Sequence, residues 1–252
     1  MTRPIALITG ASRGLGRDAA LALAARGSDL ILTYRQRADE AQAVVEAAQR
    51  LGARAVALPL DVGRSDTFAA FTAAVQAALR DTWGRAHVDH LVNNAGMGVH
   101  AAFAETTEAQ FDELMNVHFK GPFFLTQALL PLMADGGRIL NVSSGLARFA
   151  LPGYAAYAAM KGAMEVLTRY QAKELGARRI AVNILAPGAI ETDFGGGAVR
   201  DNRELNAFIA SQTALGRVGL PQDIGRAVAA LLSDDLGWVT GQRVEASGGM
   251  FL

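Results

Sequence analysis

Three side chains in this sequence have the types and spacing needed to move a proton to or from a substrate oxygen. Tyr157 and Lys161 stand four residues apart, and Ser144 precedes the tyrosine by thirteen residues. If residues 155–176 form a helix, Tyr157 and Lys161 lie one turn apart on one face. An ammonium that close to a phenol favours the phenolate, so the tyrosine could transfer a proton near neutral pH. With Ser144 on the same oxygen, the set suits carbonyl reduction or alcohol oxidation.

The alternative interpretation of this pair is a half-buried aromatic residue beside a solvated lysine. Lysine is scarce here, because only three of the 24 Lys and Arg residues are lysines: Lys120, Lys161 and Lys173. A lysine pKa shifts readily on burial, whereas arginine stays charged. The composition therefore favours the functional interpretation, and a second motif near the N-terminus favours it further.

That second motif is the glycine-rich segment Thr9–Gly16, with the spacing Gly-x-x-x-Gly-x-Gly. It joins a short apolar run, 5–9, to a predicted helix over 14–26. Glycines let the backbone turn sharply and approach a pyrophosphate, and the helix N-terminus supplies free N–H groups. Its position on the first strand–helix turn predicts a dinucleotide-binding loop.

The residues after the second apolar run indicate which dinucleotide binds. NAD sites usually carry an acid there for the ribose 2′-hydroxyl. This chain has Tyr34 and Arg35 instead, and no acid before Asp39. Arg35 could clamp a 2′-phosphate, and Arg13 could reach it from the loop. We predict that NADP(H) is preferred and NAD(H) possible, the alternative being that these arginines are simply solvated.

Short apolar runs alternate with helical patterns along the whole chain. This alternation, with unbroken apolar strands, predicts a single-domain Rossmann fold: a doubly wound parallel α/β sheet of about seven strands with helices on both faces. A (β/α)8 barrel is disfavoured by the glycine motif on the first turn. We expect one domain over 1–252. The predicted strands are 5–9, 30–34, 55–58, 88–92, 138–142, 181–185 and 242–245, and the predicted helices include 14–26, 38–51, 65–82 and 155–176.

The composition restricts the class of partner. The formal net charge is zero and 51% of the 252 residues are hydrophobic, which argues against nucleic acid or an anionic membrane as a partner. Cysteine is absent, so disulfides and thiolate metal sites are excluded. The four histidines lack ligand-like spacing with carboxylates, so no metal is predicted, and each is expected on the surface or in a loop. The N-terminal apolar run is too short for a signal peptide, so a cytoplasmic protein is expected.

With these residues assembled, the chain resembles the short-chain dehydrogenase/reductase family over essentially its whole length. Seven short motifs in order carry the resemblance, including the Thr9–Gly16 loop and Asn93-Asn94-Ala95-Gly96. It implies a catalytic tetrad of Asn116, Ser144, Tyr157 and Lys161. The family's serine–tyrosine spacing selects Ser144 over Ser143. The implied cofactor-contacting residues are Gly10, Ser12, Arg13, Gly14, Leu15, Gly16, Tyr34, Arg35, Asp61, Val62, Asn94, Ala95, Gly96, Tyr157, Lys161, Pro187, Gly188, Ile190 and Thr192.

The mechanism that the resemblance implies is hydride transfer from nicotinamide to a carbonyl carbon. Tyr157 would protonate the developing alkoxide, and Ser144 would hydrogen-bond it. Lys161 would bond the nicotinamide ribose, and Asn116 would hold a relay water through its main chain. Asparagine is unfavourable inside a helix, which suits a kinked functional site.

The substrate is less well specified. Substrate-facing residues are expected from three loops, with a mobile lid near 191–215 that contains three consecutive glycines. The mostly apolar lining favours a medium-sized, moderately apolar ketone, although Arg148 could instead bind a carboxylate. The C-terminal residues and an alanine-rich, charge-poor helix at 155–175 suggest subunit contacts, and the resemblance implies a homotetramer. The expected lining residues are Met97, His100, Leu146, Arg148, Phe149 and Leu151.

Four functions remain open. The first is an NADPH-dependent carbonyl reductase acting on a small-molecule ketone or β-keto compound. The second is an NAD(P)-dependent dehydrogenase of sugars, polyols or other secondary alcohols. The third is a non-catalytic NADP(H)-binding sensor or scaffold, which would have no need of the intact serine, tyrosine and lysine set. The fourth is an enoyl reductase, which in this family usually has a wider tyrosine–lysine spacing.

Overall fold

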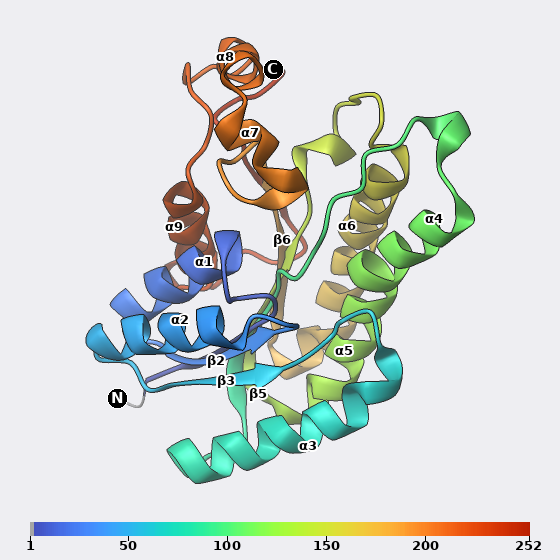
Figure 1. The fold of residues 1–252 in the computed structure, drawn as a ribbon. Helices are drawn as coiled ribbons and strands as arrows, with labels where there is room; N and C mark the ends of the chain where they lie inside the picture. Colours follow the sequence, from blue (N-terminus) through green and yellow to red (C-terminus); the bar gives the residue numbers. More distant parts are fainter. Residues whose placement is uncertain (1–2) are drawn as a thin grey trace.

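The computed structural model describes residues 3–252, which form a parallel sheet of seven strands between two layers of helices (Figure 1). The spatial order of the strands is β3-β2-β1-β4-β5-β6-β7, and every neighbouring pair is parallel. This is the seven-stranded, doubly wound sheet that the sequence predicts. The strands are β1 Ile5–Ile8, β2 Asp29–Tyr34, β3 Ala55–Pro59, β4 Val88–Asn93, β5 Met133–Val142, β6 Ala181–Pro187 and β7 Arg243–Ala246.

The helices lie on both faces of the sheet, as Figure 1 shows. Helices α1, α2 and α9 pack on one face, whereas α3, α5 and α6 pack on the other. Their bounds are α1 Gly14–Ala25, α2 Ala38–Arg50, α3 Phe68–Ala78, α4 Glu108–Met115, α5 Gly121–Leu129, α6 Ala155–Leu175, α7 Ala198–Asp201, α8 Arg203–Ser211 and α9 Pro221–Leu231.

The alternation of side chains along each strand explains why both faces are apolar. In β1, Ile5 and Leu7 point to the α3–α5 layer, whereas Ala6 and Ile8 point to the α1–α9 layer. All four side chains are fully buried. Because successive strand residues face opposite sides, a strand covered on both sides must be apolar throughout.

The strand order reverses between β1 and β4, and this reversal opens a crevice at the carboxyl ends of the strands. Strand β1 is hydrogen-bonded to β2 on one side and to β4 on the other. The connections that leave these two strands therefore run to opposite faces of the sheet. Open α/β sheets bind ligands in such a crevice.

A chain of buried amides fixes the helices below this crevice. The Asn93 amide donates to Thr126 on α5 (3.0 Å) and to Asn141 on β5 (2.9 Å). Asn141 in turn donates to Thr168 (2.9 Å) and Gln171 (3.0 Å) on α6. Buried polar groups need partners, so these bonds hold α5 and α6 in one register against the sheet.

The segment between β4 and β5 is where the sequence-based expectation was least specific, because it put Asn116 inside a helix without giving bounds for any helix there. Helix α4 begins at a capping box between Thr107 and Gln110. It continues through a π-helical turn, η4 (Asn116–Lys120), into α5. Strand β5 also begins at Met133, five residues earlier than predicted. Within residues 3–252, no helix is both long and apolar enough to cross a membrane.

The predicted lid segment, 191–215, contains a 3-10 turn and the two short helices α7 and α8, drawn in orange at the top of Figure 1. Gly195, Gly196 and Gly197 all have positive φ, between 61° and 80°. The left-handed backbone interrupts helical geometry there, as the run of glycines suggested. The segment is mostly helical rather than a long loop, and its mobility stays a prediction.

Candidate active site

The Thr9–Gly16 loop is tied to the end of β4 by a compact set of hydrogen bonds. The Thr9 hydroxyl accepts from the main-chain N–H groups of Asn94 (3.0 Å) and Ala95 (2.9 Å). The Asn94 amide donates to the carbonyls of Thr9 (2.9 Å) and Gly10 (3.2 Å). The two motifs that the sequence separates by about eighty residues therefore form one wall of the crevice.

Glycine is required at two positions in this wall. Gly10 has a φ of +64°, and a Cβ there would lie 2.9 Å from the Ala95 Cα. A Cβ on Gly16 would collide with the Gly10 carbonyl and the Asn94 amide. Both residues allow the loop to approach β4 closely while its N–H groups face the crevice at the start of α1.

The opposite wall of the crevice follows β6. The Gly188 N–H donates to the Ala246 carbonyl (3.1 Å), and Thr192 is 9% exposed. A Cβ on Gly14 would lie 3.9 Å from the Thr192 side chain, so the loop and this segment face each other. Because doubly wound sheets bind dinucleotides at this edge, we predict that these residues hold the pyrophosphate and nicotinamide ends of the cofactor.

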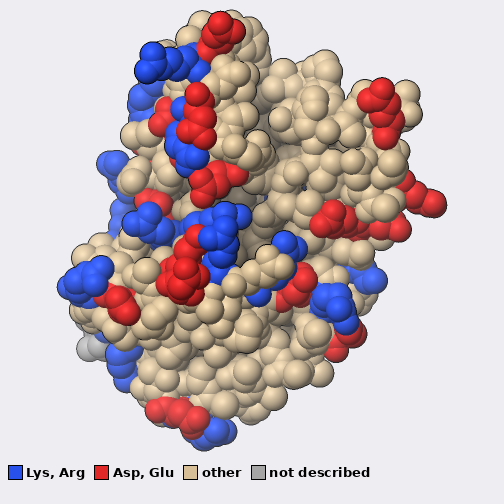
Figure 2. Space-filling view, viewed as in Figure 1, with Lys and Arg blue, Asp and Glu red and all other residues tan. Residues whose placement is uncertain are grey.

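Basic side chains lie near the end of β2, where we predict that a 2′-phosphate binds. Arg35 is exposed directly after β2 and forms no ion pair within residues 3–252. Arg13 is half-exposed, with Asp193 at 3.8 Å. Figure 2 shows charged side chains along the lower left border of the central hollow, whereas its upper right wall is uncharged. The arginines therefore suit the phosphate end of NADP(H), and the uncharged wall suits a substrate.

The remaining predicted cofactor residues line the same edge of the sheet or its immediate continuation. Ser12 and Leu15 belong to the glycine loop, and Leu15 packs against the α1–α9 core. Asp61 and Val62 follow β3, and the Asp61 carboxylate accepts from the Gly63 N–H (2.9 Å). The other positions are at strand ends: Tyr34 closes β2, Gly96 follows β4, Pro187 closes β6, and Ile190 forms a bridge with Gly219.

The two adjacent serines after β5 point in different directions, as strand alternation predicts. The Ser143 hydroxyl donates to the Glu165 carboxylate on α6 (2.7 Å). The Ser144 hydroxyl accepts from the Leu146 N–H (3.2 Å), and it lies close enough to Tyr157 to lower the pKa of the phenol against the effect of burial. The geometry therefore places Ser144, not Ser143, beside the tyrosine.

Tyr157 and Lys161 lie one turn apart on the buried face of α6. The exposed fractions of the two residues are 7% and 5%. The Lys161 ammonium donates to the Val142 carbonyl (2.8 Å) and lies 5.6 Å from the centre of the Tyr157 ring. Phe194, from the predicted lid, covers the same ring, with 5.8 Å between the centroids.

Burial shifts both groups toward their neutral forms. It raises the pKa of Tyr157 well above its ordinary value, although the nearby Ser144 hydroxyl acts in the opposite direction. Burial also lowers the pKa of Lys161 to about 7. The expected stabilisation of a phenolate by Lys161 is therefore outweighed by burial in this structure. A protonated tyrosine is a proton donor, which is the form that carbonyl reduction needs.

Asn116 lies at an irregular part of the helix, as the sequence suggested, and its main-chain role stays a prediction, whereas His118 differs from the expectation. Asn116 begins the π-helical turn, and its carbonyl accepts from the Gly121 N–H. Within residues 3–252, its side chain makes no hydrogen bond to Ser144, Tyr157 or Lys161. The expectation that all four histidines lie on the surface or in loops is wrong. His118 is 2% exposed and stands 5.1 Å from Tyr157 between ring centroids, and His90 is buried within β4.

An apolar cavity of about 380 Å³ opens beside the tyrosine's end of α6. Its wall includes Tyr154 and Ala158, which flank Tyr157 along the helix. Of the predicted lining residues, His100, Leu146 and Leu151 lie on this wall, whereas Met97, Arg148 and Phe149 do not. Size and apolar lining suit a compact apolar ligand.

Comparison with known proteins gives one family. The model of the family described as Enoyl-(Acyl carrier protein) reductase matches residues 10–251. A tetrahydroxynaphthalene reductase of Pestalotiopsis fici is 37% identical over 97% of this chain and 90% of its own. A Serratia marcescens short-chain dehydrogenase/reductase superposes with a TM-score of 0.90, at 30% identity over 99% of this chain and 98% of that chain.

This chain belongs to the short-chain dehydrogenase/reductase family.

Two further relatives are similar over nearly their whole length. An uncharacterized oxidoreductase of Methylorubrum extorquens is 38% identical over 98% of this chain and 97% of its own. The angucycline C-6 ketoreductase LanV, solved with bound NADP, has a TM-score of 0.93 and 38% identity, over 98% of this chain and 95% of that chain.

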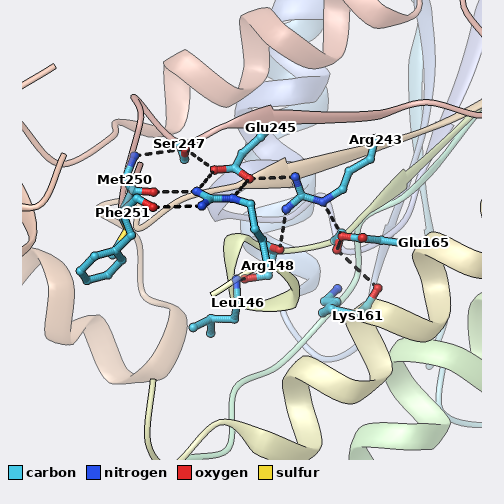
Figure 3. Close-up of polar contacts among 11 residues, drawn as sticks. Leu146, Arg148, Lys161, Glu165, Arg243, Glu245, Ser247, Met250 and Phe251 are labelled. Carbon is cyan, nitrogen blue, oxygen red and sulfur yellow. Dashed lines mark hydrogen bonds and ion pairs between the residues drawn. The ribbon is translucent and has the colours of Figure 1, made fainter. Parts of the chain in front are cut away.

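In this short-chain dehydrogenase/reductase the Arg148 guanidinium is paired with Glu245, so the prediction that it could bind a substrate carboxylate is wrong. Its guanidinium forms a two-pronged pair with Glu245 (2.9 and 2.7 Å) and donates to the carbonyls of Met250 (2.7 Å) and Phe251 (3.0 Å). Figure 3 shows that Glu245 also meets Arg243. The arginine therefore ties the loop after Ser144 to the C-terminus.

The network of charged side chains extends behind Ser144 and Lys161. Arg243 donates to Glu165 (2.7 Å), which stands one turn beyond Lys161 on α6, and to the Ser144 carbonyl at 3.5 Å (Figure 3). Hydrogen bonds from Arg148, Ser247 and Arg243 lower the pKa of Glu245 to about 2 against the effect of burial. The C-terminal strand thus braces the turn that carries Ser144.

Replacing Lys161 with methionine should separate activity from stability. Folding lowers the lysine pKa from 10.5 to about 7, so between these values the unfolded chain holds a proton that the folded chain has released. The free energy of unfolding of the wild type should therefore rise by about 1.4 kcal/mol per pH unit from this group. Lys161→Met should lack this rise and lose turnover.

Urea melts at pH 6, 7, 8 and 9 would measure the effect. Lys173→Met is the matched control, because Lys173 is an exposed lysine of the same helix. At pH 6 both folded and unfolded wild type are charged at residue 161, so Lys161→Met should be at least as stable there. Parallel pH slopes in the wild type and Lys161→Met would contradict the buried, shifted lysine.

Replacing Glu245 with glutamine should loosen the Ser144 turn. The substitution weakens the hydrogen bonds from Arg148 and Arg243, because the acceptor is no longer charged. The free energy of unfolding should therefore fall by about 1.5–3 kcal/mol. The turnover rate should fall with little change in NADPH affinity, because the network lies behind Ser144 and not in the cofactor crevice. Thermal melts and steady-state kinetics would test this. Asp66→Asn is the control, since its pair with Arg64 is exposed, and an equal loss in both variants would refute the bracing role.

Proposed function

We propose that this protein is an NADPH-dependent carbonyl reductase that converts a ketone to a secondary alcohol. The observation that carries the proposal is the buried Tyr157, whose pKa is raised by burial, beside Ser144 and one turn from Lys161 on α6. Relatives named as a tetrahydroxynaphthalene reductase and as an angucycline C-6 ketoreductase with bound NADP support the same direction and cofactor.

Each residue then has a defined task. Bound NADPH would supply the hydride for the carbonyl carbon. Tyr157 donates its proton to the carbonyl oxygen as charge develops there, and Ser144 donates a hydrogen bond to the same oxygen. Lys161 keeps one N–H on the Val142 carbonyl, which leaves its other two donors for ribose hydroxyls and orients the ammonium. Arg35 and Arg13 hold the 2′-phosphate.

For the substrate we propose a compact, apolar, ring-containing ketone. The cavity beside Tyr157 is walled by Leu146, Leu151 and the aromatic residues Phe103 and Tyr154. Arg148 cannot act as an anion site while paired with Glu245. The relatives' names, hydroxynaphthalene and angucycline reductases, refer to polycyclic aromatic compounds, and a cavity of this kind suits such a ring system.

Three other functions are weaker candidates. The family description names an enoyl reductase, but the Tyr157–Lys161 spacing of four argues against it. A sugar or polyol dehydrogenase would need polar groups where this cavity is apolar. A cofactor-binding sensor would not need Ser144, Tyr157 and Lys161 held together.

We also propose a homotetramer. Large apolar side chains are exposed on neighbouring helices α4, α5 and α6, and self-association would cover them. Their exposed fractions range from 38% to 64%, at Phe111, Phe123, Phe124, Val166 and Tyr170. The cytoplasmic location and the lid function of 191–215 stay predictions.

Oxidation of NADPH and NADH with a panel of carbonyl compounds would test the proposed function. The panel contains 1-tetralones and polycyclic quinone-derived ketones, β-keto esters, diketones, aldehydes and an enoyl thioester, with Tyr157→Phe as the blank. We expect turnover with NADPH on the ring ketones and a loss of about 10²-fold or more in the blank, because the proton donor is gone. Turnover on the enoyl thioester alone, or none despite tight NADPH binding, would contradict the proposal.

Replacing Arg35 with aspartate should reverse the cofactor preference. The substitution removes a charged hydrogen bond to the 2′-phosphate, so the ratio of NADPH to NADH affinity should fall by about 10- to 100-fold. In the wild type the same ratio should fall as salt increases, since Arg35 is exposed. Fluorescence titrations would measure both, with Arg37→Gln as the control, because Arg37 pairs with Glu40. An unchanged ratio in Arg35→Asp would refute this role.

A further inference from the structure

His118 is a buried imidazole inside the candidate active site that none of the steps above uses. It lies in the π-helical turn between α4 and α5 and is 2% exposed. Its ring meets the Tyr157 ring nearly at a right angle, with centroids 5.1 Å apart. The residue therefore contacts the proton donor directly from the side of α4 and α5.

The hydrogen bonds of His118 determine its tautomer. Nε2 lies 2.7 Å from the Met97 carbonyl oxygen and 3.2 Å from the Met97 N–H. A carbonyl can only accept, and it makes the shorter contact, so Nε2 carries the proton. Nδ1 of the neutral ring then holds a lone pair that can accept a hydrogen bond. The imidazole fixes the segment after β4, which borders the nicotinamide end of the crevice.

The Nδ1 lone pair is buried and has no hydrogen-bond partner within residues 3–252. Burial and the nearby Lys161 ammonium lower the pKa of His118 to about 3, so the ring is neutral at physiological pH. A buried acceptor without a partner is costly, which makes this one informative. The charge that acts on this ring is that of Lys161, whose ammonium donates to the Val142 carbonyl.

Gly96 makes room for this histidine. A Cβ at residue 96 would lie 2.7 Å from the His118 Cε1 and 3.4 Å from Nδ1. Any other residue at position 96 would displace the ring from Tyr157. The glycine of the Asn-Asn-Ala-Gly motif thus serves the histidine as well as the cofactor crevice.

We propose that His118 is a further α4–α5 residue that positions the proton-transfer groups, beside the main-chain role expected of Asn116. Its Nε2–H holds the Met97 segment, its ring fixes the plane of Tyr157, and its neutral Nδ1 faces Lys161 without adding a second positive charge. The inference rests on the proposed reductase function, because it assigns a role within that reaction.

Kinetics of four variants would test the proposal. His118→Leu should lower kcat by about 10- to 100-fold, because misplaced reacting groups are costly, while the NADPH Kd stays within about twofold. His118→Asn should recover most of this loss, since its amide can donate to Met97 and still accept. His90→Leu is the matched control: His90 is also buried with an unpartnered Nδ1, but it lies on β4 away from Tyr157. Unchanged kcat in His118→Leu, or loss in Asn116→Ala alone, would overturn the proposal.

An activity-independent measurement keeps the inference separate from the proposed function. With ¹⁵N-labelled histidine, His118 should give a neutral Nε2–H tautomer at pH 7, and its Nδ1 resonance should move in Lys161→Met but not in Lys173→Met. A protonated Nδ1, or a resonance that ignores Lys161→Met, would refute the positioning role. If no ketone is reduced, the proposed function fails, and this spectrum still decides whether a neutral His118 faces Lys161.

Discussion

The burial of Lys161 is the constraint on which the arrangement of this site depends. A lysine that is 5% exposed loses most of its hydration, so burial lowers its pKa to about 7 and its charge needs fixed acceptors. The Val142 carbonyl supplies one acceptor because β5 ends beside the first turn of α6. The amide chain from Asn93 through Asn141 to Thr168 fixes that distance. The position of α6 against the sheet is therefore set by polar bonds as well as by apolar packing.

The proposed reaction places two further requirements on this site. Tyr157 must stay protonated until it donates to a substrate oxygen, and burial favours the protonated form because it raises the pKa of the phenol. The turn with Ser144 must also stay rigid although it lies at a strand end. Arg148, Glu245 and Arg243 meet this demand by tying the turn to the C-terminal strand. Ser144 and Lys161 therefore lie between the buried amides of Asn93 and Asn141 and the charged network of the C-terminal strand.

Sequence reasoning recovered the parts of this structure that follow from local patterns. The apolar runs predicted seven strands, and the glycine spacing placed a loop that closely approaches Asn94. Alternation along β5 correctly separated Ser143 from Ser144. By contrast, Arg148 reads as a free loop cation because its partner Glu245 lies almost a hundred residues away. The sequence suggested a surface position for His118 because only the tertiary fold shows that it is buried against Tyr157.

The packing around Tyr157 shows why a spacing argument alone could not find every residue that contacts it. His118 reaches the tyrosine ring from a π-helical turn between α4 and α5, a local irregularity of the kind often found at functional sites. The imidazole is accommodated because residue 96 is a glycine, since a Cβ there would lie 2.7 Å from the His118 Cε1. Residues 96, 118 and 157 belong to different elements, so their contact depends on the tertiary fold and not on any local pattern.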